Sequence, residues 1–416
     1  MNHRETNSTS IPIEPPSRGR QLFNEIVGGS VMISILSVVL AMIVGGVLIA
    51  VTNPQVQQAS GYFFARPGDT FTAIWNSVGG AYAALFQGSI FNPNRPDLLS
   101  QIKPFTETLT FATPLIAAGL GVGVAFRVGM FNIGGQGQIL IAVACAGWVG
   151  FTLNLPWGLH LAIAILAGII GGALWGGIPG LLKARTGAHE VIVTIMLNYV
   201  AFYLVSYLLR TPILKAPGSN NPISAPIKPS AILPSLFGPQ FNLHFGFVLA
   251  ILATVFVWWL LNRSALGFRF RAVGANPNAA RVAGIDVKRM YVYAMLISGG
   301  LVALAGISQV LGTVTSGFGS GIDAGIGFDA ITVALLGRSR PIGIFIAGTL
   351  FGAFKAGGFS MQAVVNIPVD MVLVVQALIV LFIAAPALVR AAFRLPNPAA
   401  TRRQLTTRTS SLPAAK

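Results

Sequence analysis

Long apolar runs recur along this chain, and they constrain its fold more than any other feature. A helix needs roughly 20 apolar residues to cross the hydrocarbon core of a bilayer. Hydrophobic residues make up 54% of the 416 residues and charged residues only 9%, whereas a soluble domain averages about 25% charged residues. So little charge cannot cover a surface that faces water. The chain is therefore predicted to be an all-α polytopic membrane protein.

About ten transmembrane segments are predicted, five on each side of an external connection at 210–242. They are 31–51, 105–126, 138–153, 159–182, 191–209, 243–261, 291–313, 328–337, 341–358 and 368–389. Segment 328–337 is too short to cross alone, so a half-helix and a re-entrant segment both remain open. Segment 71–86 is moderately apolar and is predicted to be an interfacial helix, although a crossing there would invert the topology after it.

The distribution of basic residues predicts that both termini are cytoplasmic. The net charge is +16, with 27 Lys and Arg residues. With the N-terminus inside, 20 of these 27 fall in cytoplasmic segments and 6 outside, while Lys355 lies within a span. Positive residues are enriched on the cytoplasmic side of membrane proteins, so the charge requires no nucleic acid partner.

This topology divides the chain into three parts. They are a polar cytoplasmic segment at 1–30, a transmembrane domain at 31–389 that includes a cytoplasmic loop at 262–290, and a basic cytoplasmic tail at 390–416.

Two polar, glycine-rich breaks lie at matching positions of the two halves, at 131–138 and 317–327. Paired breaks of this kind are typical of a substrate path in transporters. Asn132, Gln136 and Gln138 carry amides at membrane depth, where an unpaired polar group is costly. They are candidates for contacting an uncharged polar solute. The alternative is that they hydrogen-bond only to other helices.

The cytoplasmic loop 262–290 contains a short helix expected at 276–282. Asn276 suits the cap of that helix and Pro277 its first position. A short helix projecting from a membrane domain offers a surface that a cytoplasmic ATPase can push. The alternative is an ordinary basic loop.

Other chemistry is scarce in the sequence. The single cysteine, Cys145, and four scattered histidines give no metal-ligand spacing, and no G-x-x-x-x-G-K-[ST] motif is present. Few carboxylates fall within the apolar segments, which argues against an ion-coupled carrier. Glycines recur every four residues from Gly168 to Gly180, a pattern that favours close helix packing or, alternatively, a subunit interface.

Three blocks of sequence carry a resemblance to a known family: 126–138, 190–198 and 274–285. In them the chain resembles the permeases of the ribose, nucleoside and branched-chain amino acid group of ABC importers, and is most similar to the nucleoside branch. The resemblance implies a cell-membrane location and a second homologous permease subunit, or a homodimer. It also implies a cytoplasmic ATPase with two nucleotide-binding domains and an extracytoplasmic substrate-binding protein. No cofactor is expected on this chain, because the partner uses the ATP.

The resemblance also carries site residues. A substrate path is expected at Phe131, Asn132, Gly134, Gly135, Gln136, Gln138 and Asn198. ATPase coupling is expected at Gly274, Asn276, Pro277, Ala279, Ala280, Arg281 and Gly284. The E-A-A signature found in other importers is absent.

The sequence therefore predicts an ATP-driven importer permease, without an ATPase site of its own, that carries nucleosides. The alternatives are the same machinery for a ribose-like sugar or a branched-chain amino acid, an ion-coupled secondary transporter, and a membrane scaffold that transports nothing.

Overall fold

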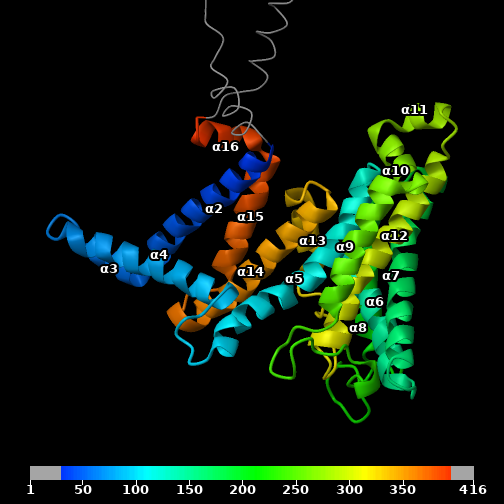
Figure 1. Cartoon of the computed structure of the whole chain (residues 1–416), viewed down its shortest axis with the longest axis horizontal. Coiled ribbons are helices and arrows are strands. Elements are labelled where there is room, and N and C mark those ends of the chain that lie inside the picture. The colour runs from blue at the N-terminus through cyan, green and yellow to red at the C-terminus, as the bar shows by residue number, and fades with distance from the viewer. Residues whose placement is uncertain (1–29, 395–416) are drawn as a thin grey trace, which may run out of the picture. The chain divides into compact units, whose positions relative to one another are not determined.

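Helices form the regular structure of this protein (Figure 1). The computed structural model describes residues 30–394, and within that range it contains no β-strand. Residues 1–29 of the predicted polar segment, and residues 395–416 of the predicted basic tail, lie outside the described residues.

The helices match the ten predicted segments one by one. Eight helices of residues 30–394 are long and apolar enough to cross a membrane. These are α2 (Ser30–Thr52), α5 (Leu98–Arg127), α6 (Gly135–Thr152), α7 (Leu159–Thr186), α8 (Glu190–Leu208), α9 (Gly246–Arg263), α12 (Val287–Ser308), which continues into the π-helical turn η2 (Gln309–Thr313), and α14 (Pro341–Val365). A ninth segment consists of α15 (Asp370–Ala384) and α16 (Pro386–Ala392), bent by 96° relative to each other. The tenth, α13 (Ile326–Leu336), is short, as predicted.

Other helices lie between these segments. They are α3 (Pro54–Ser60), α4 (Pro67–Ser89), η1 (Pro229–Ala231), α10 (Ala265–Ala275) and α11 (Pro277–Val282). Helix α4 contains the predicted 71–86 helix and is longer at both ends. It packs closely on α14, because a Cβ on Gly357 would lie 2.5 Å from the carbonyl oxygen of Leu85.

The chain divides into two compact units. Among the described residues, one combines 30–44 with 377–394, and the other comprises 45–376. The larger unit contains all the sites described below.

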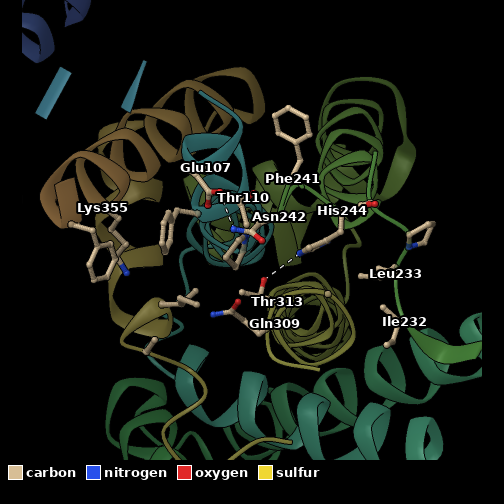
Figure 2. A pocket seen from close by; sticks show the side chains of 18 of the residues that line it. Glu107, Thr110, Ile232, Leu233, Phe241, Asn242, His244, Gln309, Thr313 and Lys355 are labelled. Carbon is tan, nitrogen blue, oxygen red and sulfur yellow. Dashed lines mark hydrogen bonds between the residues drawn. The ribbon is translucent and has the colours of Figure 1, made fainter. Parts of the chain in front are cut away.

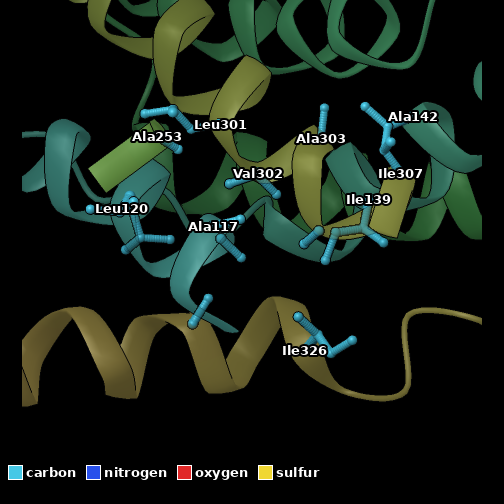
Figure 3. Close-up of a cluster of buried hydrophobic side chains, with 14 of the residues drawn as sticks. Ala117, Leu120, Ile139, Ala142, Ala253, Leu301, Val302, Ala303, Ile307 and Ile326 are labelled. Carbon is cyan, nitrogen blue, oxygen red and sulfur yellow. The ribbon is translucent and has the colours of Figure 1, made fainter. Parts of the chain in front are cut away.

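Helices α5 and α12 form the centre of the larger unit. Helix α5 belongs to the first half but packs against α13 and α14 of the second half. Helix α12 belongs to the second half but packs against α6 and α7 of the first. This reciprocal packing is consistent with two structurally related halves. Leu120 of α5, Ile139 of α6 and Val302 of α12 are fully buried in one apolar core, shown with their neighbours in Figure 3.

The glycine stripe of α7 lies in this core. A Cβ on Gly172 would lie 2.9 Å from the carbonyl oxygen of Gly299 on α12, and one on Gly176 would lie 2.9 Å from the Cα of Gly299. Small residues let the two backbones approach closely. The prediction of close helix packing is therefore confirmed, with the packing inside one subunit.

Candidate functional site

The two polar breaks meet each other. Gly135 begins α6 and Gly327 lies in the first turn of α13. A Cβ on Gly135 would lie 2.9 Å from the carbonyl oxygen of Gly327, and a Cβ on Gly327 would overlap the backbone nitrogen of Gln136. We call this contact between residues 134–136 and 325–327 the junction. Only glycine allows the two backbones to approach so closely.

The length of α13 sets the depth of the junction. Helix α13 runs from the junction towards Ser339, whose carbonyl oxygen accepts a hydrogen bond from Arg127 Nε at 2.9 Å. Arg127 is the last residue of α5. The 11 residues of α13 rise about 16 Å at 1.5 Å each, roughly half of a 30 Å hydrocarbon core. Segment 128–134 therefore re-enters from the end of α5 to about half depth.

Asn132 ties the re-entrant segment to its surroundings. Its Nδ2 donates to Gln138 Oε1 at 3.0 Å and to Ser298 Oγ at 2.8 Å. Its Oδ1 accepts from Gln138 Nε2 and from the Gly134 nitrogen, each at 3.0 Å. Asn132 is fully buried and Gln138 is 1% exposed. All the donors and acceptors of Asn132 are used within the protein, so none is left for a solute.

Asn198 on α8 holds the same segment from the other side. Its Oδ1 accepts from the Gly137 nitrogen, and its Nδ2 donates to the Ile133 carbonyl, both at 2.9 Å. The Glu190 carboxylate, which pairs with Lys183, lies close to the Phe131 backbone of this segment. Asn198 therefore braces the break in the same way as Asn132 and Gln138.

Phe131 and Gln136 differ from these three residues. The Phe131 ring is 53% exposed and lies 5.1 Å from the Phe126 ring, centroid to centroid. Gln136 is half-buried, and its side chain lies close to the carboxylate of Asp323, which belongs to the second break. Of the predicted path residues, these two keep surface that a solute can reach.

A cavity of about 860 Å³ lies elsewhere in the larger unit. Its walls come from α5, from segment 229–244, from the η2 turn of α12 and from α14 (Figure 2). This volume is in the range of small-molecule sites, about 300–1,000 Å³. None of the seven predicted path residues lines it.

Glu107 and Asn242 form the first polar group of the cavity. Asn242 Nδ2 donates to Glu107 Oε1 at 2.8 Å, and the second carboxylate oxygen has no partner among the described residues. Glu107 lies inside the predicted span 105–126, but sequence reasoning missed it. An ionisable residue within an apolar segment was the signal that could have found it.

His244 and Thr313 form the second polar group. The Gly246 nitrogen donates to His244 Nδ1 at 3.1 Å, so Nδ1 carries no proton. The proton is on Nε2, which donates to Thr313 Oγ1 at 3.3 Å. Burial lowers the pKa of His244 from 6.5 to about 4, so the ring is neutral near pH 7. The Thr313 hydroxyl proton is then available to a ligand.

Gln309 is the third polar group, and it begins the η2 turn. Its side-chain amide lines the cavity and has no hydrogen-bond partner among residues 30–394. Single π-turns within α-helices are frequent at functional sites. Gly312 of the same turn lets the His244 ring pack against it, since a Cβ there would overlap the ring.

Lys355 lines the cavity from α14, but it is already paired. Its Nζ lies 2.7 Å from Asp329 Oδ2 on α13. The charges of Lys355 and Asp329 cancel each other. Glu107 is therefore the charged side chain of the cavity that has no oppositely charged partner.

The predicted coupling segment forms two short helices, α10 and α11. Asn276 Oδ1 accepts from the nitrogens of Asn278 at 2.9 Å and Ala279 at 3.1 Å, which confirms the predicted cap. Ala280 is buried, whereas Val282 is 91% exposed. Helix α11 is therefore anchored on one side and open on the other. The remaining predicted coupling residues are exposed: Gly274, Pro277, Arg281 and Gly284.

The coupling segment touches the start of the first break. A Cβ on Gly274 of α10 would overlap the carbonyl oxygen of Arg127, and a Cβ on Gly129 would lie 3.7 Å from the Gly274 Cα. Helix α10 thus rests on the backbone that leads from α5 to the junction.

Comparison with known proteins identifies the family to which this chain belongs. Residues 105–384 match the family described as branched-chain amino acid transport system / permease component. No solved structure matches the chain.

Three curated relatives are similar over most of their length. The guanosine ABC transporter permease protein NupP of Bacillus subtilis (strain 168) is 36% identical, covering 86% of this chain and 94% of that protein. The glucose ABC transporter permease protein TsgB13 of Haloferax volcanii is 37% identical over 67% and 75%. The nucleoside ABC transporter permease protein NupB of Lactococcus lactis subsp. cremoris is 34% identical over 69% and 80%.

Proposed function

We propose that this chain, which belongs to the family of permease components of branched-chain amino acid transport systems, imports nucleosides as part of an ATP-driven transporter. It is a multi-pass protein of the plasma membrane. One observation carries the choice of nucleosides: the relative that aligns over 86% of this chain and 94% of its own length is a guanosine permease.

The glucose permease is the reason to keep a second substrate in view. Its identity, 37%, equals that of the guanosine permease within a percentage point, but it covers only 67% of this chain. A simple sugar is therefore the second candidate, carried by the same machinery.

The proposed machinery includes three kinds of partner. A second permease subunit, related or identical, completes the membrane part. A cytoplasmic ATPase with two nucleotide-binding domains hydrolyses ATP, and an extracytoplasmic binding protein delivers the solute. This chain supplies the path and the surface that the ATPase moves, and it binds no cofactor itself.

The contacts of Gly274 support a route for coupling. The ATPase pushes the exposed face of α11, and α10 transmits the displacement to the backbone at Arg127. The re-entrant segment 128–134 is fixed by Asn132 and Asn198, so it moves as one piece and shifts the junction. Because the junction joins the two halves, its displacement changes how they sit against each other, which is the basis of alternating access.

Uptake in cells tests the proposed substrate. Labelled guanosine, adenosine and glucose are offered to cells that express the whole transport cluster, with or without this chain. Uptake of nucleoside that depends on both the chain and ATP is expected. If the assembled complex takes up glucose and no nucleoside, the substrate proposal is overturned and the sugar candidate replaces it. Uptake that survives ATP depletion but not collapse of the ion gradient would indicate a secondary transporter.

The coupling route has its own test, the substitution Gly274→Ala. The new methyl group would push α10 away from the Arg127 carbonyl, so ATP hydrolysis should continue while uptake falls at least about tenfold. The matched control is Ala275→Ser on the exposed side of α10, which should leave both rates unchanged. Normal uptake by Gly274→Ala, at equal amounts of complex in the membrane, would show that the force takes another route.

A further inference from the structure

The cavity and the junction are separate places, and only the cavity has room for a solute together with unpaired polar groups. Glu107 keeps one carboxylate oxygen without a partner among the described residues, Gln309 keeps its whole amide, and Thr313 keeps its hydroxyl proton. Figure 2 shows these side chains converging on the cavity from α5 and from the end of α12. An unpaired polar group that is partly buried costs free energy, so a ligand that pairs with it is stabilised.

The charge of the cavity selects against anions. Lys355 is paired with Asp329, and His244 is neutral because its unprotonated Nδ1 accepts a hydrogen bond from the Gly246 N–H. Counting Asp329, which pairs with Lys355 but does not line the cavity, the ionised side chains in and beside the cavity carry one net negative charge, that of Glu107. A phosphate ester would be repelled, while an uncharged solute would not.

The acceptor chemistry of Glu107 narrows the solute further. An ionised carboxylate only accepts hydrogen bonds, so its partner must be a donor. A ribose ring offers two adjacent hydroxyl donors at its 2′ and 3′ positions, and acidic residues recognise ribose hydroxyls in this way in dinucleotide sites. Hydrogen bonds to a charged acceptor are also stronger than neutral ones.

Aromatic rings lie next to this carboxylate. Phe111 is four residues after Glu107, so both project from one face of α5. Its ring stacks on that of Phe359 from α14 at 5.6 Å between centroids, with 26° between the planes. Both rings line the cavity. A carboxylate beside flat apolar rings matches a molecule with a diol beside a flat heterocycle.

We propose that this cavity binds a ribonucleoside, with Glu107 accepting hydrogen bonds from the ribose 2′,3′-diol and the Phe111–Phe359 pair contacting the base. Gln309 and Thr313 bond to the polar edges of the ligand. This assignment rests on the proposed nucleoside transport. It adds the location of the binding site, the residues that contact the ligand and the ligands that the site prefers. Ribonucleosides bind better than 2′-deoxyribonucleosides, and nucleotides are rejected.

A single-cysteine experiment tests the place. Cys145 is the only cysteine of the chain, so Cys145→Ala gives a cysteine-free background. Ser235→Cys then adds a thiol to the cavity wall, and Asn220→Cys adds one to an exposed loop position outside it. Each variant is assembled with its partner permease and ATPase in nanodiscs without the binding protein. The rate of thiol labelling is measured with adenosine, 2′-deoxyadenosine, AMP and glucose.

Adenosine should slow labelling of the Ser235→Cys variant and leave the Asn220→Cys variant unaffected. Because a site that bonds a hydroxyl rejects the analogue that lacks it, 2′-deoxyadenosine should need at least about tenfold more to give the same protection. AMP and glucose should not protect. When Glu107→Gln is added to the Ser235→Cys variant, 2′-deoxyadenosine and adenosine should give equal protection at nearly equal concentrations.

The outcomes separate failure of this inference from failure of the proposed function. If the complex transports adenosine but adenosine gives no protection, the cavity is not the binding place and the transport function stands. Equal protection by both nucleosides in the Ser235→Cys protein overturns the role of Glu107, even if the Glu107→Gln variant fails to assemble. If glucose protects and no nucleoside is transported, the proposed substrate class is itself wrong.

Discussion

The junction and the cavity contain the same kinds of polar side chain in opposite states. At the junction, Asn132 and Gln138 bond to each other, to Ser298 and to backbone, and no space remains beside them. In the cavity, Gln309 and Glu107 face about 860 Å³ of open volume with bonding capacity left over. A polar residue at membrane depth is therefore no sign of ligand contact by itself. What distinguishes a binding residue is an unused donor or acceptor together with room for a partner.

The two regions also differ in what they are built to do. The junction joins the two halves through backbone contacts that allow no side chain, which suits the proposed role of transmitting displacement. The cavity is lined by side chains from separate elements, so its shape depends on how those elements are placed. In the proposed coupling route, the ATPase would act on the junction through α10 without contacting the solute.

The largest effect is expected at the junction, from Asn132→Ala. This change leaves the Gln138 amide and the Gly134 nitrogen without the oxygen they bond, and Ser298 without its donor. Each unpaired buried group costs roughly 1–3 kcal/mol, so the free energy of unfolding should fall by at least about 3 kcal/mol. The measurement is the yield and the melting temperature of the purified complex.

Asn220→Ala, in the exposed loop, is the control and should match the unmodified protein. If Asn132→Ala instead melts normally but changes which solute is transported, Asn132 contacts the solute and the comparison between the two regions breaks down.

The sequence predicted the junction better than it predicted the cavity. Apolar runs of sufficient length identified the helices and the short α13, because hydropathy is a local property. The glycine-rich composition of 131–138 also identified the break. Sequence could not show that Asn132 bonds to Ser298, 166 positions away. An amide that braces the fold and an amide that binds a ligand look alike until their neighbours are known.

The cavity was missed for a related reason. Its residues come from segments that lie far apart along the chain, and most of them have no distinctive local sequence pattern. Gln309 gains its orientation from a π-turn that begins at that residue, and no composition signal marks such a turn. Asn242 belongs to a loop whose only sequence feature is its polar composition. Two of the cavity residues gave a local signal, Glu107 as a carboxylate inside an apolar segment and Lys355 as a charged residue within a span.

A smaller effect is expected from acid, through His244 in the cavity wall. Burial lowers the pKa of His244 from 6.5 to about 4. Between these two pH values, His244 is protonated in the unfolded chain but not in the folded protein. The free energy of unfolding is therefore constant above about pH 7 and falls as the pH drops from 6.5 towards 4. The full loss is roughly 3 kcal/mol.

Melting temperatures of the complex at several pH values between 7.5 and 4.5 measure this loss. His244→Gln cannot titrate at this position, so its profile should be flatter than that of the unmodified protein. Glu107 and Lys355, the other ionisable groups of the cavity, are present in both proteins and cancel in the comparison. Parallel profiles would mean that His244 is protonated as easily in the folded protein as in the unfolded chain.

The smallest effect is expected from Gln309→Met, and it separates the cavity from the junction most directly. Methionine keeps the length of the side chain but removes the unpaired amide, so no bond within the protein is lost. The melting temperature should therefore stay within a degree or two of the unmodified value. Loss of one neutral hydrogen bond to the solute costs about 1 kcal/mol, so protection of the Ser235→Cys thiol should need roughly fivefold more adenosine. Gln362→Met, on the exposed surface of α14, should change neither quantity. A Gln309→Met protein that melts much earlier but binds adenosine normally would place Gln309 with Asn132, among the residues that brace the fold.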